Sequence, residues 1–176
     1  EMKDQLILVE TPLYDGRAAA VMAEAKKLAP GKPLKTVVNS HHHFDHSGGL
    51  RAAVAEGATL VTSAMAKPYF ERVFANPNRI APDLLARSGR SASIAAVNGV
   101  LVIDDGTRRV EVHEMTGSIH ALGFQMVWLP RERLLIEADA YTPAPAGTPP
   151  PPVPNANHVS LVQNIERLKL DVDRIL

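Results

Sequence analysis

Four histidines and one aspartate stand within six consecutive residues of this sequence, His41-His42-His43-Phe44-Asp45-His46. The segment directly follows the apolar run 34–38, whose β-branched residues predict a buried strand. Residues two apart in an extended chain point to the same side, so we expect His41 and His43 to face one metal ion while His42 faces away. Asp45 and His46 follow where the chain turns, and they can face a second ion beside the first.

This segment indicates a metal site rather than an expression tag or a solvated loop. A tag would be terminal and uniform, whereas this segment is internal and continues into Ser47-Gly48-Gly49, which predicts a turn. Imidazole nitrogen and carboxylate oxygen suit zinc in tetrahedral or five-coordinate geometry. The expected cofactor is therefore zinc, as one or two ions, with iron or manganese as alternatives.

The first half of the chain alternates predicted strands and helices. Strands are predicted at 5–10, 34–38 and 58–62, and helices at 18–28, 50–56, 63–75 and 80–87, while 88–98 fits no single pattern. Pro68 predicts either a kink or a later start of its helix. The first strand is apolar throughout, which predicts a central position in its sheet. This order implies parallel strands joined by crossover helices.

The second half changes character and predicts two hairpins. Their strands are predicted at 100–103 with 108–112 and at 124–129 with 134–137. Residues 142–154 hold seven of the fourteen prolines and predict a loop. An amphipathic helix is predicted at 159–170, and 173–176 begins a further strand. The apolar positions of this helix are Val159, Val162, Ile165 and Leu168.

The spacing His-x-His-x-Asp-His resembles the metal-binding signature of the metallo-β-lactamase superfamily. Two later segments resemble further metal motifs of that family, one containing His120 and the other ending at Asp139. By this resemblance His120 joins His41 and His43 on the first ion, and Asp139 bridges the two ions. Taken alone, His120 would be a solvated loop residue and Asp139 a turn residue. The chain has Ala138 where the family usually has glycine, and Met115-Thr116-Gly117-Ser118 where Thr-Pro-Gly is commoner.

The resemblance implies an α/β fold, a four-layer αβ/βα sandwich with mixed sheets, as a single domain over residues 1–176. Family members have further strands before the first strand and a last metal histidine after the final one. We therefore expect a chain truncated at both ends, with one ligand missing from the second metal site. His158 precedes the last helix, so we expect it to be a substrate-facing residue or an alternative sixth ligand. Unpaired sheet edges would favour association between chains.

The ligand chemistry predicts a metal-dependent hydrolase. Zinc lowers the pKa of bound water from 15.7 to about 7 and so supplies hydroxide at neutral pH. Asp45 would position this hydroxide as well as bind metal. The expected substrate is a small molecule with an ester, thioester, lactone or β-lactam-type bond. The alternatives are an oxidoreductase with one iron ion, as in the persulfide dioxygenases of the same superfamily, and a domain that binds metal without turnover.

The composition excludes several other classes of function. Lysine and arginine number 19 and aspartate and glutamate number 19, so no charge excess favours nucleic acid or an anionic membrane. The chain has no cysteine, which excludes disulfides, thiolate zinc ligands and a cysteine nucleophile. No apolar stretch approaches the roughly 20 residues of a membrane span. We expect a soluble protein of the bacterial cytoplasm or periplasm.

Overall fold

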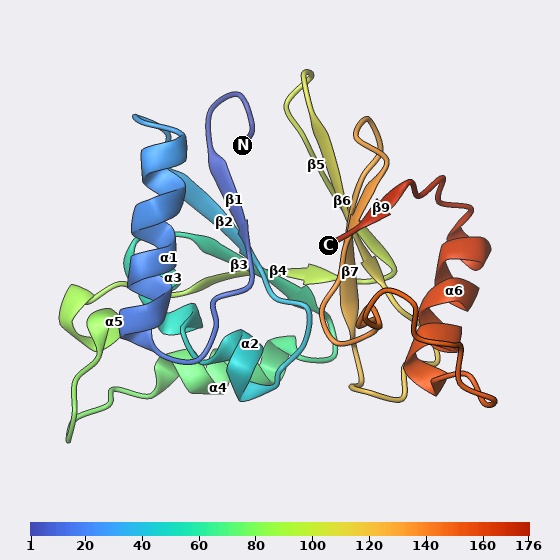
Figure 1. Ribbon diagram of the computed structural model, residues 1–176. Helices are drawn as coiled ribbons and strands as arrows, with labels where there is room; N and C mark the ends of the chain where they lie inside the picture. The colour runs from blue at the N-terminus through green and yellow to red at the C-terminus, as the bar shows by residue number, and fades with distance from the viewer.

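Four parallel strands form the first sheet, in the order β1-β2-β3-β4. The computed structural model describes residues 1–176. Helices connect the successive strands and cover the outer face of this sheet (Figure 1). The strands are β1 (Leu6–Val9), β2 (Leu34–Val38), β3 (Thr59–Ser63) and β4 (Ser93–Val97); the helices are α1 (Asp15–Leu28), α2 (Phe44–Ser47), α3 (Leu50–Ala55), α4 (Lys67–Ala75) and α5 (Leu84–Ser88).

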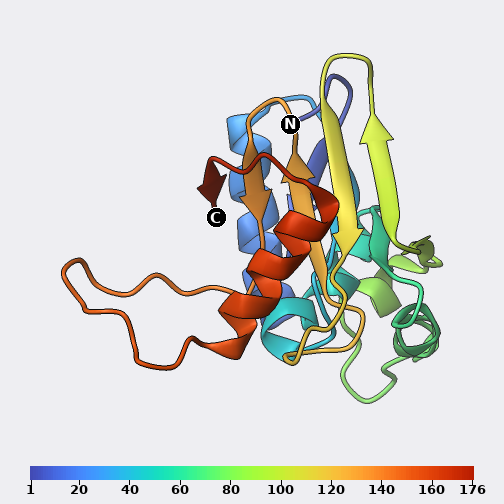
Figure 2. The same cartoon turned by 90° about the vertical axis from the view of Figure 1, so that its right-hand side faces the viewer.

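The second sheet has five strands in sequence order and packs its inner face against the first sheet. The first four are antiparallel neighbours, and the last pairs in parallel with the strand before it. Helix α6 (Ala156–Leu168) covers the outer face (Figures 1 and 2). The strands are β5 (Val100–Asp104), β6 (Arg109–Glu114), β7 (Gln125–Leu129), β8 (Leu134–Ile136) and β9 (Arg174–Ile175).

Three apolar cores lie between the four layers. Helices α1, α3 and α4 bury Met22, Leu50 and Phe70 against the first sheet. Branched side chains fill the space between the sheets, as the β propensity of valine favours: Val38, Val61, Val97, Val110, Val112 and Val127. Helix α6 buries Leu161 against Met126, Trp128 and Leu135 of the second sheet. The predicted α/β fold, a four-layer αβ/βα sandwich, is confirmed.

Strand β1 lies at the edge of the first sheet, so its predicted central position is wrong. Its side chains alternate between two cores. Leu6 and Leu8 pack on the helix side, whereas Ile7 and Val9 pack between the sheets. The continuous apolar run therefore reflects layers on both faces of the strand and carries no information about its neighbours within the sheet.

Helix α6 buries only part of the face that its apolar residues predict: Ile165 and Leu168 pack on the core of the second sheet, but Val159 and Val162 are exposed. Val159 is 39% exposed and Val162 is 53% exposed, while Ser160 and Asn164 are buried beside Leu161. Both polar atoms of the Asn164 side-chain amide are used. Its Nδ2 donates to the Ser160 and Thr116 carbonyls, and its Oδ1 accepts from the Thr116 backbone amide. Hydrogen bonding thus makes burial of this polar residue favourable.

The two glycines that follow the histidines allow close packing rather than an unusual turn. Gly48 and Gly49 have φ angles of −62° and −98°, which any residue can adopt. A Cβ atom on Gly48 would lie 1.9 Å from the Leu13 carbonyl oxygen, and one on Gly49 would lie 2.4 Å from the Ala18 Cβ. The segment after His46 therefore packs closely on α1 and on the loop between β1 and α1.

The proline-rich segment 142–154 has no helix or strand and extends away from the sandwich between β8 and α6 (Figure 2). Its residues are exposed throughout. None of the six helices combines the length and the apolar character needed to cross a membrane.

Candidate metal centre

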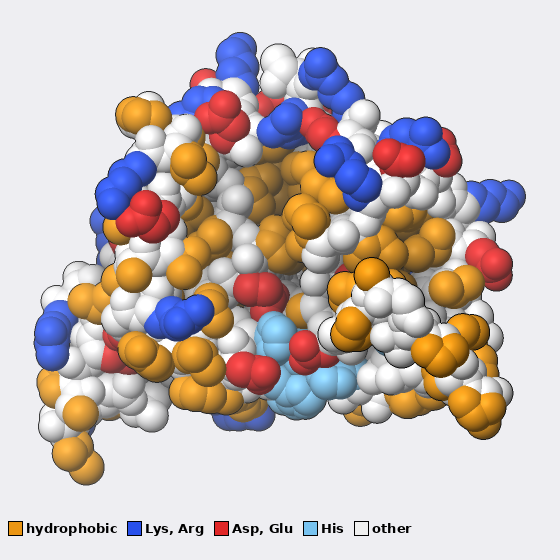
Figure 3. Space-filling view, in the orientation of Figure 1, with side chains coloured by type: hydrophobic (Ala, Val, Ile, Leu, Met, Phe, Trp, Pro, Cys, Tyr) orange, Lys and Arg blue, Asp and Glu red, His pale blue; other side chains and the backbone are white.

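Two overlapping groups of ligand atoms meet where the two sheets approach each other. One group comprises His41, His43, His120 and Asp139, and the other comprises Asp45, His46 and Asp139. Within each group the ligand atoms all lie within 4.8 Å of one another. Figure 3 shows the histidines together below the hollow between the two sheets, with acidic side chains beside them. The structure thus brings together the six residues expected to bind metal, and Asp139 belongs to both groups.

His41 is the most deeply buried of these residues, with an exposed fraction of 2%. It lies three residues beyond the end of β2, and its ring stacks on Phe124 with centroids 5.0 Å apart. Its Nδ1 lies 2.8 Å from the Ser40 hydroxyl, which leaves Nε2 to face the cluster. Burial, together with the positive charges that His46, His43 and His120 would carry, lowers the pKa of His41 to about 3. His41 is therefore neutral at physiological pH, as a metal ligand must be.

His42 and His43 point to different surroundings, as their spacing predicts. The ring of His43 lies 4.5 Å from that of His41 and 4.8 Å from that of His120. His42 is exposed and pairs edge-on with Tyr69 of α4, at 6.3 Å between centroids. His42 therefore contributes no atom to either ligand group.

Glu10 is a residue of the centre that the sequence reasoning missed. Its Oε2 atom lies 2.7 Å from Nδ1 of His46, and its Oε1 atom accepts a hydrogen bond from the Ser40 amide. The interaction with Glu10 raises the pKa of His46 to about 9, although burial opposes this shift. A carboxylate at the end of a strand parallel to the histidine strand was the available signal, because the carboxyl ends of parallel strands meet at one edge.

Glu10 and Asp139 share an uncommon backbone conformation. Their φ angles are 70° and 60°, in the left-handed region that residues other than glycine rarely adopt. Each residue follows a strand end, and each directs a carboxylate toward His46. Strained backbone of this kind concentrates at functional sites, where the surrounding structure maintains it.

His120 reaches the centre on a loop that α6 holds in place. The loop connects β6 with β7, and Asn164 and Ser160 of α6 bond to Thr116 and Gly117 within it. At the far end of the loop, the Gln125 amide donates to the Ser40 carbonyl. These contacts join the loop to the second sheet's helix and to the segment that carries His41.

Asp139 lies in a tight turn after β8. The Glu137 carboxylate accepts hydrogen bonds from the Ala140 and Tyr141 amides and so spans the turn. Burial raises the pKa of Glu137, and the nearby charge of Asp139 adds to the increase. Oδ2 of Asp139 lies 3.0 Å from Nε2 of His46 and 3.1 Å from Nε2 of His120.

The donor set fits a zinc ion. Nε2 of His41 and Nε2 of His120 lie only 3.2 Å apart, and Asp139 is adjacent to both. Two neutral rings can share this contact only if one of the two nitrogens carries a proton. A cation, in contrast, can accept a lone pair from each nitrogen and charge from the carboxylate. The second group offers three ligands, one imidazole and two carboxylates.

Three of the predicted site residues lie outside the first group, namely His46, Asp45 and His158. Asp45 is at the rim, with its side chain 63% exposed and its Oδ2 atom 3.4 Å from Nε2 of His46. His158 belongs to neither ligand group. Its ring instead pairs with Tyr141, at 4.9 Å between centroids, near the two ends of the proline-rich segment.

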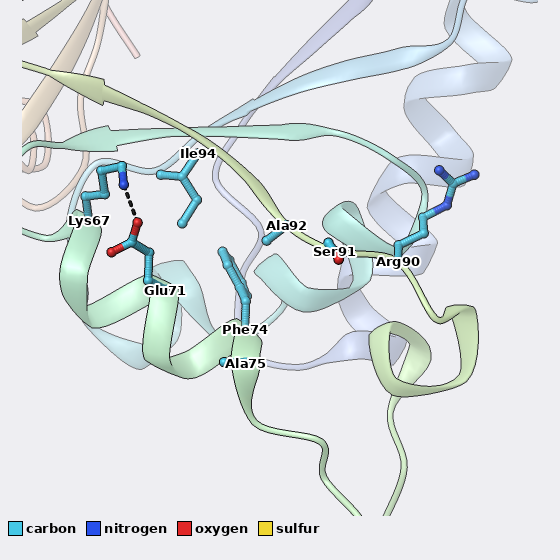
Figure 4. A pocket seen from close by; sticks show the side chains of 8 residues that line it. All are labelled: Lys67, Glu71, Phe74, Ala75, Arg90, Ser91, Ala92 and Ile94. Atoms are coloured by element: carbon cyan, nitrogen blue, oxygen red, sulfur yellow. Dashed lines mark hydrogen bonds and ion pairs between the residues drawn. The ribbon is translucent and has the colours of Figure 1, made fainter.

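A cavity of about 440 Å³ lies apart from the histidines, between α4 and the segment that leads into β4 (Figure 4). Its charged residues include Lys67 and Glu71, which form an ion pair with each other, and Arg90 on the opposite side. No member of either ligand group lines this cavity. Its volume alone therefore gives no indication of where chemistry occurs.

The sequence matches the family model described as the metallo-beta-lactamase superfamily over residues 3–176. Among curated proteins it is similar to the linear primary-alkylsulfatase of a Pseudomonas species, with 32% identity over 100 residues. This match covers 54% of the chain but only 18% of the alkylsulfatase.

Two solved structures share the fold at low sequence identity. A metallo-beta-lactamase from Pontibacter korlensis superposes with a TM-score of 0.69 and 17% identity, covering 99% of this chain and 75% of that one. The DIM-1 metallo-beta-lactamase exposed to ceftazidime gives a TM-score of 0.69 and 16% identity, covering 99% and 73%. At these identities the likeness concerns the fold alone.

Proposed function

This chain belongs to the metallo-beta-lactamase superfamily, and we propose that it is a zinc-dependent hydrolase of an ester, thioester, lactone or β-lactam-type bond. Family membership and the His/Asp cluster support a metal-dependent hydrolase in general. Zinc as the metal and the kind of bond are our proposal. The observation that carries it is the meeting of three imidazoles and the Asp139 carboxylate within 4.8 Å.

Each residue of the centre has a role that follows from its surroundings. His41, His43 and His120 would hold the ion, which lowers the pKa of bound water to about 7 when zinc is present. Asp45, exposed at the rim, can accept a proton from the attacking water and orient it. Glu10 fixes the ring orientation of His46 through Nδ1, so that Nε2 faces Asp139.

The proposal is tested by measuring metal content together with hydrolysis. Protein purified without oxygen would be analysed for zinc, iron and manganese, and then assayed against carboxylic esters, thioesters, lactones, β-lactams and phosphoesters. We expect bound zinc and hydrolysis of at least one class, lost on chelation and restored by zinc. The matched control is the His41→Ala variant, which zinc should not restore.

Other outcomes of this experiment identify the alternatives. One iron ion per chain, with oxygen consumption on a persulfide, would replace the hydrolase with an oxidoreductase. Full metal occupancy without turnover on the whole panel would indicate a metal-binding domain.

Sulfate esters also belong in the substrate panel. The similarity to the linear primary-alkylsulfatase supports a substrate with a sulfate ester on a primary alkyl chain. We propose this class as a second candidate, and release of inorganic sulfate from hexyl or decyl sulfate tests it directly.

A further inference from the structure

An exposed apolar surface lies beside the candidate metal centre, on the side of α4. Four large side chains there are strongly exposed: Phe44 at 66%, Met65 at 59%, Tyr69 at 43% and Leu122 at 72%. Exposed apolar side chains scattered singly are common, whereas contiguous apolar patches include ligand-binding grooves among their uses. We define these four residues together with His42 as the apolar rim.

The apolar rim is concave. A cavity of about 220 Å³ is lined by His42, Met65, Ala66, Tyr69 and Leu122. A second cavity, of about 210 Å³, shares His42 and Tyr69 with the first and adds Phe44, Phe70 and Phe74. The edge-on pair of His42 and Tyr69 thus lines both cavities.

The same two segments of chain supply the rim and the metal ligands. His42 stands between two proposed ligands, and its ring lies 5.1 Å from that of His43. Leu122 follows His120 by two residues. The next residue, Gly123, packs so closely on the start of the β3–α4 connection that an added Cβ would lie 2.3 Å from the Ser63 hydroxyl and 3.6 Å from the Met65 Cβ. This packing brings the His120 loop to the β3–α4 connection, and Leu122 and Met65 line the first cavity together with His42.

The lining of the first cavity offers no charged group to a ligand. Its only polar side chain other than the Tyr69 hydroxyl is the imidazole of His42. In the second cavity the one strongly charged side chain is Arg51, whose guanidinium is already paired with Asp83. A ligand with a second charge would remain uncompensated here, whereas a hydrocarbon would replace water at apolar surface.

From this arrangement we infer that the apolar rim binds the linear hydrocarbon chain of the substrate, while the ester group lies at the metal centre. This inference rests on the proposed hydrolase function and adds the substrate class, namely esters with an unbranched apolar chain. Each methylene buried in the cavities would strengthen binding by up to about fourfold. The gain should stop once the chain fills the available length.

The test uses alkanesulfonates, which carry the anionic head of a sulfate ester but have no ester bond to hydrolyse. Calorimetry below the micellar concentration would compare butane-, hexane-, octane- and decanesulfonate on the zinc-loaded chain. We expect affinity to rise with chain length in the wild type. Leu122→Asn and Met65→Gln should remove most of this rise without changing zinc content. Both side chains are exposed, so the fold should tolerate either change.

Ile80→Asn is the matched control, because Ile80 is fully exposed and lines neither cavity of the rim. This variant should keep the wild-type dependence on chain length. The inference is overturned if wild-type affinity does not depend on chain length, or if the Leu122 and Met65 variants retain the full dependence. Failure of the proposed function would look different, since the chain-length dependence would persist although no ester is hydrolysed.

Discussion

Glu10 and His46 form an ion pair that joins the end of β1 to the short helix α2. Oε2 of Glu10 lies 2.7 Å from Nδ1 of His46 and is otherwise without a partner inside the protein. The other carboxylate oxygen accepts a hydrogen bond from the Ser40 amide, next to His41. The side chain that directly follows β1 therefore fixes two segments of the candidate metal centre.

We predict that Glu10→Gln weakens metal binding at the second group by about 10- to 100-fold, the usual cost of losing a residue that orients a ligand. Glutamine keeps the size and an acceptor for the Ser40 amide but loses the charge that holds His46. Competition with a chromophoric chelator measures the affinity. Glu24→Gln is the control, since Glu24 is an exposed partner of Lys27 on α1. Equal metal affinities of the Glu10→Gln and Glu24→Gln variants would contradict a role of Glu10 in metal binding.

The first ligand group predicts a contrast between neighbouring histidines. His41→Ala and His120→Ala should each lower zinc stoichiometry and abolish hydrolysis, because each removes one of three imidazoles around Asp139. His42→Ala should keep the zinc, because the ring of His42 pairs with Tyr69 outside the group. The number of zinc ions per chain measures the loss of a ligand, and the circular dichroism spectrum shows whether the variant is still folded. Full zinc and full activity in His120→Ala would contradict the assignment of His120.

Asp45→Asn separates the charge of this residue from its shape. Loss of a positioned proton acceptor should lower the rate constant about 100-fold or more, even where the first ion is retained. Asp45 is largely exposed, so we expect little change in the free energy of unfolding. Steady-state rates between pH 6 and 9 provide the measurement. A variant with wild-type rates over this range would exclude Asp45 from the mechanism.

The two ligand groups differ in size, which predicts unequal affinities. Four residues form the first group and three form the second, with Asp139 shared. Zinc titration of metal-free protein should therefore show two unequal steps or a single bound ion. His158→Ala should leave the titration unchanged, because His158 packs on Tyr141. Two equally tight ions, with the second lost in His158→Ala, would make His158 the sixth ligand.

Arg51 and Asp83 form an ion pair away from the metal centre, and we predict that this pair stabilises the fold. The guanidinium of Arg51 pairs with Asp83 and donates to the Val73 carbonyl, and so joins α3, the end of α4 and the start of α5. Burial opposes ionisation of Asp83, but the bonds from Arg51 and the Ala86 amide dominate and lower its pKa. Asp83→Asn should therefore cost on the order of 2 kcal/mol in the free energy of unfolding at pH 7.

The pH dependence of this contribution has a definite sign. A carboxylate whose pKa is lowered by folding stabilises the protein above its unfolded pKa of about 3.9, and the contribution is lost as pH falls through the folded value. The difference between wild type and Asp83→Asn should thus be constant near neutrality and shrink below about pH 4. Urea unfolding at several pH values measures it. A difference that grows on acidification would contradict the proposed role of the pair.

The sequence by itself determined the fold class, through the family resemblance, and it predicted candidate metal ligands. The segment from His41 to His46 has fixed local spacing, and strand geometry alone separates His42 from its two neighbours. Strands and helices with continuous apolar periodicity were also predicted close to their observed bounds, because local pattern and tertiary burial agree there. Resemblance to the family supplied His120 and Asp139, which no local pattern identifies.

Only the tertiary structure decided the features that depend on contacts between distant segments. Glu10 and His46 are 36 positions apart, and their pairing results from the parallel alignment of β1 with β2. The edge position of β1 and the buried face of α6 depend on which layers cover them and which hydrogen bonds satisfy Asn164. The apolar rim arises in the same way, since Leu122 and Met65 line one cavity because the His120 loop packs on the β3–α4 connection. Such contacts leave no periodic signal in the sequence, because each depends on how separate elements pack together.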